Sequence, residues 1–242
     1  MNDVLVLCYH AVSPDWPAAL STTPELLEAH LRLLAGRGYR GATFTDVVTG
    51  PPPAGRVAVI TFDDAYRSIL TRARPILAAH GFPATVFVPT DWVGRDEPMA
   101  WPGIDRWLGG PHEPDLYPLD WKELAELADD GWEVGSHSCS HPRLTALDDA
   151  ALDRELGLSR ALVERHLDRP CSSFAYPYGD VDDRVAGAAR RAGYTTGAAL
   201  ARRLSPLGVL RVPRVGIYRA DTRARFRIKI SPLGRRLRAH VG

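Results

Sequence analysis

Two adjacent carboxylates, Asp63 and Asp64, end the apolar run of residues 57–62. The run contains β-branched residues and does not alternate with polar ones, which is typical of a strand buried on both faces. Adjacent carboxylates repel each other, so both stay ionised only if a cation or hydrogen-bond donors compensate one of them. A metal ion is the natural compensator, and the carboxyl end of a buried parallel strand is where α/β folds place their chemistry.

Two imidazoles, His137 and His141, follow a second apolar segment, residues 132–136. On a helical turn, side chains at i and i+4 share one face, so the two rings could hold one ion. Two histidines and one carboxylate leave a coordination position open for water, as in catalytic zinc sites. A histidine pair alone is more often a helix cap and a solvent-exposed ring, but the carboxylate pair at another strand end favours the metal. Cys139 would point away from the shared face, and we exclude it as a ligand.

Two further segments end in residues suited to catalysis. His10 follows the apolar residues 4–8, and the turn Pro177-Tyr178-Gly179 follows residues 172–175. Such a turn can aim a backbone N–H, here that of Tyr178, at a developing oxyanion, although alone it is only a strand-to-loop turn. The remaining histidines have no acidic companions, and we interpret them as surface residues: His30, His80, His112, His166 and His240.

The elements that must position these residues alternate along the chain. We expect strands at 4–8, 40–44, 57–62, 84–88, 132–136, 172–175 and 195–200. We expect helices at 24–36, 68–80, 120–129, 148–167 and 182–192. This alternation predicts an α/β fold with a parallel sheet and right-handed crossovers, and about 250 residues is a common length for one closed barrel. We therefore expect a single barrel domain over residues 1–242.

Two segments interrupt the alternation. Residues 90–118 are rich in Pro, Gly and Trp, and a segment of this length without periodicity predicts a loop insertion over one end of the barrel. The tail from about residue 219 is strongly basic. Peripheral contact with an anionic lipid surface and a solvated terminal helix are both open interpretations of this tail. The lack of a clear apolar face favours the helix.

Composition limits the partners and the compartment. The formal net charge is +1 with acids and bases interspersed, which gives no argument for a nucleic-acid partner. Three cysteines, Cys8, Cys139 and Cys171, cannot all pair within the chain and lack the spacing of a zinc framework, so we expect reduced thiols. The N-terminal residues have no basic region and only a short apolar stretch, which predicts a cytoplasmic location. The oligomeric state stays open.

Three motifs taken together resemble the polysaccharide deacetylases, carbohydrate esterase family four. They are Thr61-Phe62-Asp63-Asp64, His137-Ser138-Cys139-Ser140-His141 and Tyr176-Pro177-Tyr178-Gly179, in this order. The similarity spans residues 57 to about 200. It implies a distorted (β/α)7 barrel, one divalent metal ion, usually zinc with cobalt or nickel as alternatives, and removal of acetyl groups from N-acetylated sugars.

The resemblance also assigns roles to individual residues. Asp63 would be the general base, and Asp64, His137 and His141 would bind the metal. The backbone N–H of Tyr178 would stabilise the oxyanion together with the metal.

One position departs from the family pattern in the third motif. Ala175 stands where the family commonly has an arginine that orients the base. Arg211 or Arg214, after a late strand, could replace it, and the sequence does not decide between them.

A second departure concerns the catalytic acid, because no Leu-x-His strand end follows Leu200. The opening Leu7-Cys8-Tyr9-His10 is similar to that of the circularly permuted branch, which includes deacetylases of biofilm poly-N-acetylglucosamine and places the acid-bearing strand first. The first and last strands of a closed barrel are neighbours, so we predict His10 as the acid. The alternative is a plain polar residue that ends an edge strand.

The predicted function is metal-dependent N-deacetylation of an N-acetylated saccharide, free or lipid-linked. A metal-dependent amidohydrolase acting on a non-sugar amide and an inactive carbohydrate-binding relic are the alternatives. Aromatic faces stack on sugar rings, and several lie in or beside the 90–118 insertion, although burial beneath it explains them equally well. They are Trp92, Trp101, Trp107, Tyr117 and Trp121.

Overall fold

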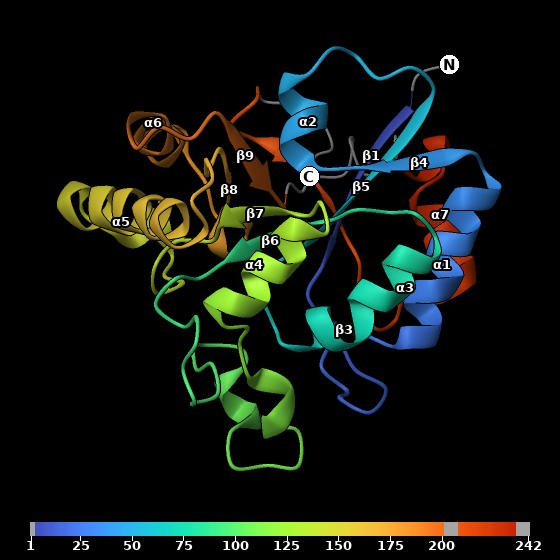
Figure 1. Ribbon diagram of the computed structural model, residues 1–242, viewed down its shortest axis with the longest axis horizontal. Helices are drawn as coiled ribbons and strands as arrows, with labels where there is room; N and C mark the ends of the chain where they lie inside the picture. Colours follow the sequence, from blue (N-terminus) through green and yellow to red (C-terminus); the bar gives the residue numbers. More distant parts are fainter. Residues whose placement is uncertain (1–2, 201–207, 236–242) are drawn as a thin grey trace.

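A parallel sheet rolled into a barrel organises residues 3–200 and 208–235, which are the residues that the computed structural model describes (Figure 1). Its strands are β1 (Asp3–Tyr9), β4 (Tyr39–Ala42), β5 (Arg56–Phe62), β6 (Thr85–Val88), β7 (Glu133–Ser136), β8 (Ser173–Ala175), β9 (Thr196–Ala199), β10 (Val212–Pro213) and β11 (Val215–Gly216). A separate pair, β2 (Ala11–Val12) and β3 (Ser21–Thr22), lies outside this sheet. The strand order is β10-β9-β8-β7-β6-β5-β1-β11, and β4 also pairs with β5.

The barrel is closed by one short segment around Arg214, which separates β10 from β11. The Arg214 N–H donates to the Ala199 carbonyl at 2.9 Å on one side, and the Ile217 N–H donates to the Cys8 carbonyl at 2.7 Å on the other. The same few residues therefore join β9 to β1. The predicted distorted (β/α)7 barrel is confirmed, and its distortion is visible at β5, where β4 and β6 pair with successive halves of one strand edge.

The helices form the outer layer of the molecule. They are α1 (Pro24–Gly36), α2 (Phe44–Thr49), α3 (Arg74–Ala79), α4 (Trp121–Asp129), α5 (Asp149–Leu167), α6 (Asp183–Arg191) and α7 (Arg223–Lys229). Helix α1 packs against α3 and α7, and α5 packs against α4 and α6 (Figure 1). Side chains of Thr23, Asp120, Asp148 and Asp182 cap helix N-termini by accepting otherwise unpaired backbone N–H groups. The predicted helix 68–80 begins as a π-helical turn, Ile69–Ala73.

The strand predicted at 40–44 ends earlier than expected, at Ala42, and Phe44 begins the short helix α2. Phe44 belongs to a small apolar cluster with residues of five barrel strands: Val6, Val57, Val59, Phe87, Ala175 and Ala198. These residues alternate with strand neighbours that pack into the larger core beneath the helices, such as Leu5 and Leu7 beside Val6. Successive side chains of a strand point to opposite faces, so the small cluster fills the inside of the barrel.

Residues 90–118 form a long excursion between β6 and α4, the green segment at the bottom of Figure 1. It contains two 3-10 turns, Asp105–Trp107 and Glu113–Leu116, and is anchored by the buried side chains of Met99, Ile104 and Leu116. In the basic tail, Arg223–Lys229 is helical, whereas Arg236, Arg238 and His240 lie outside the described residues. Among the residues described, no helix combines the length and the apolar character needed to cross a bilayer.

Candidate active site

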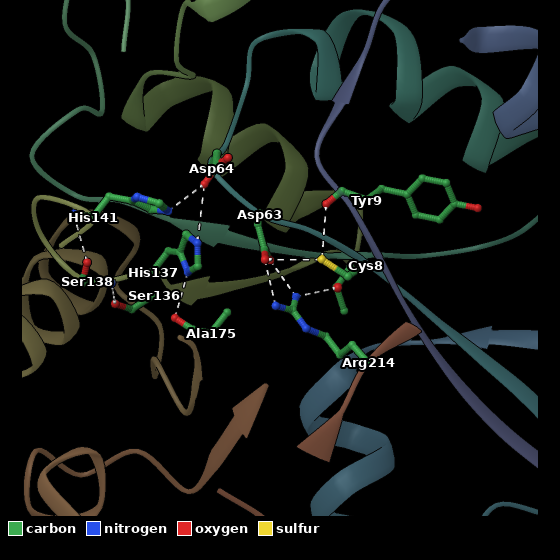
Figure 2. A network of polar contacts seen from close by, with 11 residues as sticks. Cys8, Tyr9, Asp63, Asp64, Ser136, His137, Ser138, His141, Ala175 and Arg214 are labelled. Atoms are coloured by element: carbon green, nitrogen blue, oxygen red, sulfur yellow. Dashed lines mark hydrogen bonds and ion pairs between the residues drawn. The ribbon is translucent and has the colours of Figure 1, made fainter. Parts of the chain in front are cut away.

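The side chains of Asp64, His137 and His141 meet at the carboxyl ends of β5 and β7 (Figure 2). Oδ1 of Asp64 lies 3.5 Å from Nε2 of His137 and 3.3 Å from Nε2 of His141, and one ligand atom from each residue lies within 4.8 Å of the others. All three side chains are buried. Nδ1 of His137 is 2.8 Å from the Ala175 carbonyl, an acceptor, so Nδ1 carries the hydrogen and Nε2 offers a lone pair.

This donor set fits a divalent metal ion. Oδ1 of Asp64 is buried and has no hydrogen-bond partner among the described residues. A carboxylate oxygen that faces imidazole lone pairs is unfavourable unless a cation lies between them. Burial opposes ionisation of Asp64; when no cation is bound and the His137 and His141 nitrogens that face it carry protons instead, the two rings outweigh burial and hold the pKa of the carboxyl well below its usual range. One carboxylate and two imidazoles are ligands of zinc, and cobalt and nickel accept the same donors.

The two histidines do not lie on a helical turn, and that prediction was wrong. Residues 137–141 form an irregular turn in which Ser138 and His141 adopt positive φ angles of 68° and 64°. Glu155 of α5 holds this turn by accepting the backbone N–H groups of Cys139 and Ser140, at 2.8 and 3.0 Å, and the Ser140 hydroxyl at 2.7 Å. The left-handed backbone, rather than helical spacing, brings the imidazoles together.

Cys139 does not join the ligand group. Its Sγ lies 3.5 Å from the Glu155 carbonyl, on the side of the turn that faces α5. This position agrees with the exclusion of Cys139 as a ligand. The reason given for the exclusion, a helical turn, was wrong, because residues 137–141 form an irregular turn.

Asp63 is held by Arg214 in a two-pronged ion pair inside the barrel (Figure 2). Nη1 donates to Oδ1 at 2.6 Å and Nη2 donates to Oδ2 at 2.8 Å, while Nη1 also donates to Oγ1 of Thr61 at 2.9 Å. The guanidinium lies 5.3 Å from the ring centre of Phe87, on top of the inner apolar cluster. Burial opposes ionisation of Asp63, but Arg214 outweighs it and lowers the pKa of the carboxyl to about 2.

Arg211, the other candidate for this role, pairs with Asp183 at the surface instead, at 2.7 Å. The arginine that contacts the predicted base is therefore Arg214.

His10 lies beside Asp63 because β1 and β5 pair in register, with Tyr9 opposite Phe62. The next residues along the two strands are then His10 and Asp63. Strand β1 lies between β5 and β11, so the first strand does neighbour the last one, as a permuted barrel requires. The imidazole is half-buried, and its Nδ1 is a buried atom with no hydrogen-bond partner among the described residues.

Tyr178 lies in a 3-10 turn, Pro177–Gly179, and adopts a positive φ of 60°. Its ring packs edge-on against His141, with centroids 4.7 Å apart, and the Arg143 guanidinium lies 4.5 Å from the centre of the Tyr178 ring. A side chain at Gly179 would place its Cβ 2.6 Å from Cβ of Leu200, so the turn passes close to the chain after β9. This close approach explains why glycine follows Tyr178.

All six predicted site residues line one pocket of about 290 Å³. Its walls are formed by His10, Leu20, Asp63, Asp64, Trp101, Pro102, Gly103, Ile104, His137, His141, Arg143, Tyr178 and Leu200. The segment 101–104 comes from the predicted insertion and covers one side of the site.

Of the five aromatic residues considered for sugar stacking, only Trp101 lines this pocket. Trp101 is 6% exposed and stacks on His141, with centroids 4.2 Å apart. Trp92 packs edge-on against Trp101, and Trp121 stacks on His166 outside the pocket. The other four are half-buried and do not line the pocket, so four of the five do not form a stacking platform for sugar rings at this site.

His30 was predicted to lie on the surface, and this was wrong. The side chain is fully buried, with Nδ1 3.1 Å from the Tyr9 hydroxyl and Nε2 2.9 Å from the Asp221 carbonyl. Burial lowers the pKa of His30 to about 4, so the ring is neutral. The sequence did contain an indication that His30 is buried, because position 30 falls in the apolar stripe of α1 with Leu27, Leu31 and Leu34.

Two other contacts of the site carry no sequence motif. Cys8 places its Sγ 3.4 Å from Oδ2 of Asp63, and Glu155 holds the ligand turn from a helix. The first contact follows from the pairing of β1 with β5, and the second from the packing of α5 against β7.

Comparison with known proteins agrees with this geometry. The family model described as polysaccharide deacetylase matches residues 50–197, more than half of the chain. The chain therefore belongs to the polysaccharide deacetylase family.

Among curated relatives, YxkH of Bacillus subtilis (strain 168) is 25% identical over 196 residues, which are 79% of this chain and 62% of that protein. The poly-β-1,6-N-acetyl-D-glucosamine N-deacetylase of Staphylococcus aureus is 27% identical over 150 residues, which are 58% of this chain and 47% of that protein. The chain thus spans less than two thirds of the length of either relative.

Solved structures show the same fold. The Streptococcus pyogenes deacetylase PplD superposes with a TM-score of 0.77 at 22% identity, covering 95% of this chain and 98% of that one. IcaB from Ammonifex degensii gives a TM-score of 0.72 at 22% identity, covering 93% of this chain and 95% of that one.

Proposed function

We propose that this protein is a metal-dependent N-deacetylase that removes acetyl groups from an N-acetylated sugar or glycan and releases acetate. The observation that carries this proposal is the placement of two different polar groups in one pocket. The Asp64, His137 and His141 donors lie beside Asp63, which is ion-paired and is not part of that donor set. The family and the printed activity of the staphylococcal relative support an N-acetyl substrate.

Asp64, His137 and His141 would hold one divalent ion, with zinc as the first choice and cobalt or nickel as alternatives. When bound, such an ion polarises the acetyl carbonyl and lowers the pKa of water towards about 7. His137 is aimed by its hydrogen bond to the Ala175 carbonyl, and His141 is fixed between Trp101 and Tyr178. These contacts limit the orientations of both rings before any ligand arrives.

Asp63 would accept the proton of the attacking water. Its two oxygens are fixed by the Arg214 fork, so the carboxylate cannot rotate away from the pocket. Because Arg214 lowers the pKa of Asp63, the carboxylate is ionised throughout the physiological pH range.

His10 would donate a proton to the departing amine, because an amine leaves poorly as an anion. It lines the same pocket and follows the strand that pairs with β5. The backbone N–H of Tyr178 would stabilise the negative charge that develops on the acetyl oxygen. The products are acetate and a free amino sugar.

Two alternatives to a sugar N-deacetylase remain, and the experiment described below distinguishes them from the proposal. An amidohydrolase acting on a non-sugar amide fits the same polar groups, and the position of four of the five aromatic side chains outside the pocket lining weakens the argument for sugar. An inactive relic was suggested by the missing motif-three arginine and the missing late histidine. The Arg214 contact with Asp63 argues against the first reason, and the position of His10 in the pocket argues against the second.

The test measures acetate release, with zinc, cobalt or nickel added, from N-acetylated oligosaccharides, lipid-linked N-acetylated sugars and simple N-acetyl amides without a sugar. Release from saccharides alone supports the proposal. Release from the simple amides alone supports the amidohydrolase. No release from any substrate, in protein that has bound its metal, would contradict both enzyme hypotheses.

A further inference from the structure

Cys8, His10 and Asp63 form a second cluster of metal-binding atoms beside the first one. One ligand atom from each residue lies within 4.8 Å of the others, and Sγ of Cys8 is 3.4 Å from Oδ2 of Asp63 (Figure 2). Cys8 belongs to β1 and lies on the same face of that strand as Val6 of the inner cluster, and His10 is the first residue after the strand. The pairing of β1 with β5 then places Asp63 next to them.

The chemistry of this cluster suits a thiophilic divalent ion. A thiolate, an imidazole and a carboxylate are all ligands of zinc, and cadmium prefers sulfur more strongly. Ligand atoms around one tetrahedral ion are about 3.5 Å apart, given metal–ligand bonds of about 2.0–2.3 Å, so small side-chain movements suffice. Nδ1 of His10 is buried without a hydrogen-bond partner among the described residues, and His10 lines the open pocket that gives access.

We propose that Cys8, His10 and Asp63 bind a second divalent ion, zinc or cadmium, and that this ion inhibits the enzyme. On binding, the Cys8 S–H bond breaks, its proton leaves to solvent and sulfur bonds to the ion without any change of oxidation state. Occupancy would remove both proton-transfer groups at once, because Asp63 and His10 become ligands. The inhibitory part rests on the proposed function, whereas the binding part does not.

The second site should bind more weakly than the Asp64 site. The Arg214 guanidinium donates to Oδ2, the Asp63 oxygen closest to Cys8, and its positive charge opposes a second cation. Binding also has to displace a thiol proton, which makes the affinity dependent on pH. The Asp64, His137 and His141 group has no such cation in contact among the described residues. Ions should therefore fill the Asp64 site first and the Cys8 site only in excess.

The binding test uses the full chain loaded with one equivalent of zinc and then titrated with cadmium. A cadmium–thiolate charge-transfer band in the ultraviolet should grow to a plateau at about one equivalent, because the Asp64 site contains no sulfur. Cys8→Ser should lose the band, while Cys139→Ser and Cys171→Ser, which remove the other two buried thiols, should keep it. Circular dichroism identifies a Cys8→Ser protein that fails to fold, and Cys8→Ala then replaces it. A band that survives in a folded Cys8 variant, or none in the wild type, would overturn the proposal.

The activity test follows acetate release as zinc is raised from one equivalent to a large excess. Each variant is compared with its own rate at one equivalent. Wild-type activity should fall in excess zinc. Cys8→Ser should need at least about tenfold more zinc for half inhibition, which is the lower end of the loss in metal affinity when a contact that supports a metal site is removed. Equal inhibition of both proteins means that excess zinc acts elsewhere and overturns the proposal. A protein that shows the cadmium band but releases no acetate under any condition contradicts the proposed function and leaves the second site standing.

Discussion

Both Nη atoms of Arg214 donate hydrogen bonds to the Asp63 carboxylate, at 2.6 and 2.8 Å, although the two residues are 151 positions apart in the sequence. Both side chains are almost completely buried, so neither charge is compensated by water. The pair lies between the inner apolar cluster of the barrel and the pocket, and Arg214 sits in the segment that closes the sheet. Closure of the fold and orientation of the predicted base therefore depend on the same residue.

Replacing Arg214 by Met should destabilise the protein by about 3–5 kcal/mol, because it leaves Asp63 buried and unpaired. Adding Asp63→Asn to that variant should restore a large part of the free energy of unfolding, measured by chemical denaturation, without restoring acetate release. Similar stabilities of the single and double variants would show that the ion pair does not carry this energy.

Replacing His137 or His141 by Ala should abolish retention of the single divalent ion. Each change removes one of three ligands, and the remaining two cannot form the site. Elemental analysis of purified protein should give about one ion per chain for the wild type and nearly none for either variant. Full retention by both variants would refute the ligand assignment.

Replacing Glu155 by Ala should weaken zinc retention against a chelator by at least about tenfold, because the left-handed turn between the histidines loses three hydrogen bonds. Glu155→Gln keeps an acceptor oxygen and should lose less. Asp153→Ala, on the same helix in a surface pair with Arg191, is the matched control and should bind zinc normally. Equal zinc affinities for Glu155→Ala and the control would contradict a role for Glu155.

Replacing His10 by Gln should slow the chemical step, because the amide side chain of glutamine cannot donate a proton to the departing amine as an imidazolium does. An aryl amide, whose leaving group needs less protonation, should recover a large part of the lost rate, while metal content stays unchanged. Wild-type rates on a sugar amide in this variant would exclude His10 as the acid.

Replacing Asp63 by Asn should retain the metal and reduce turnover by about a hundredfold or more, the usual scale for loss of a general base. The wild type should also show an acid-dependent loss of stability that this variant lacks. The pKa of Asp63 is lowered in the folded protein, from 3.8 to about 2, so its contribution is present above pH 4 and is lost as the pH falls through this range. Loss of metal from Asp63→Asn would reverse the assignment of the two aspartates.

The sequence by itself determined the fold class and the six site residues that line the pocket. A buried parallel strand is recognisable from a β-branched apolar run, and whatever follows it must emerge at the carboxyl edge of the sheet. That local rule placed Asp63, Asp64, His137 and Tyr178 at strand ends before any contact was known. For His10 this rule was not sufficient, and the prediction also required that the first and last strands of a closed barrel are neighbours.

Tertiary structure alone decided which distant partners these residues meet. Arg211 and Arg214 are equally basic, and only the register of the closing segment turns Arg214 inward while Arg211 pairs with Asp183 at the surface. The Cys8 contact with Asp63 and the Glu155 contact with the ligand turn likewise join separate elements. Strand and helix periodicities are local properties of the chain, whereas partner choice depends on long-range pairing, which composition and spacing do not encode.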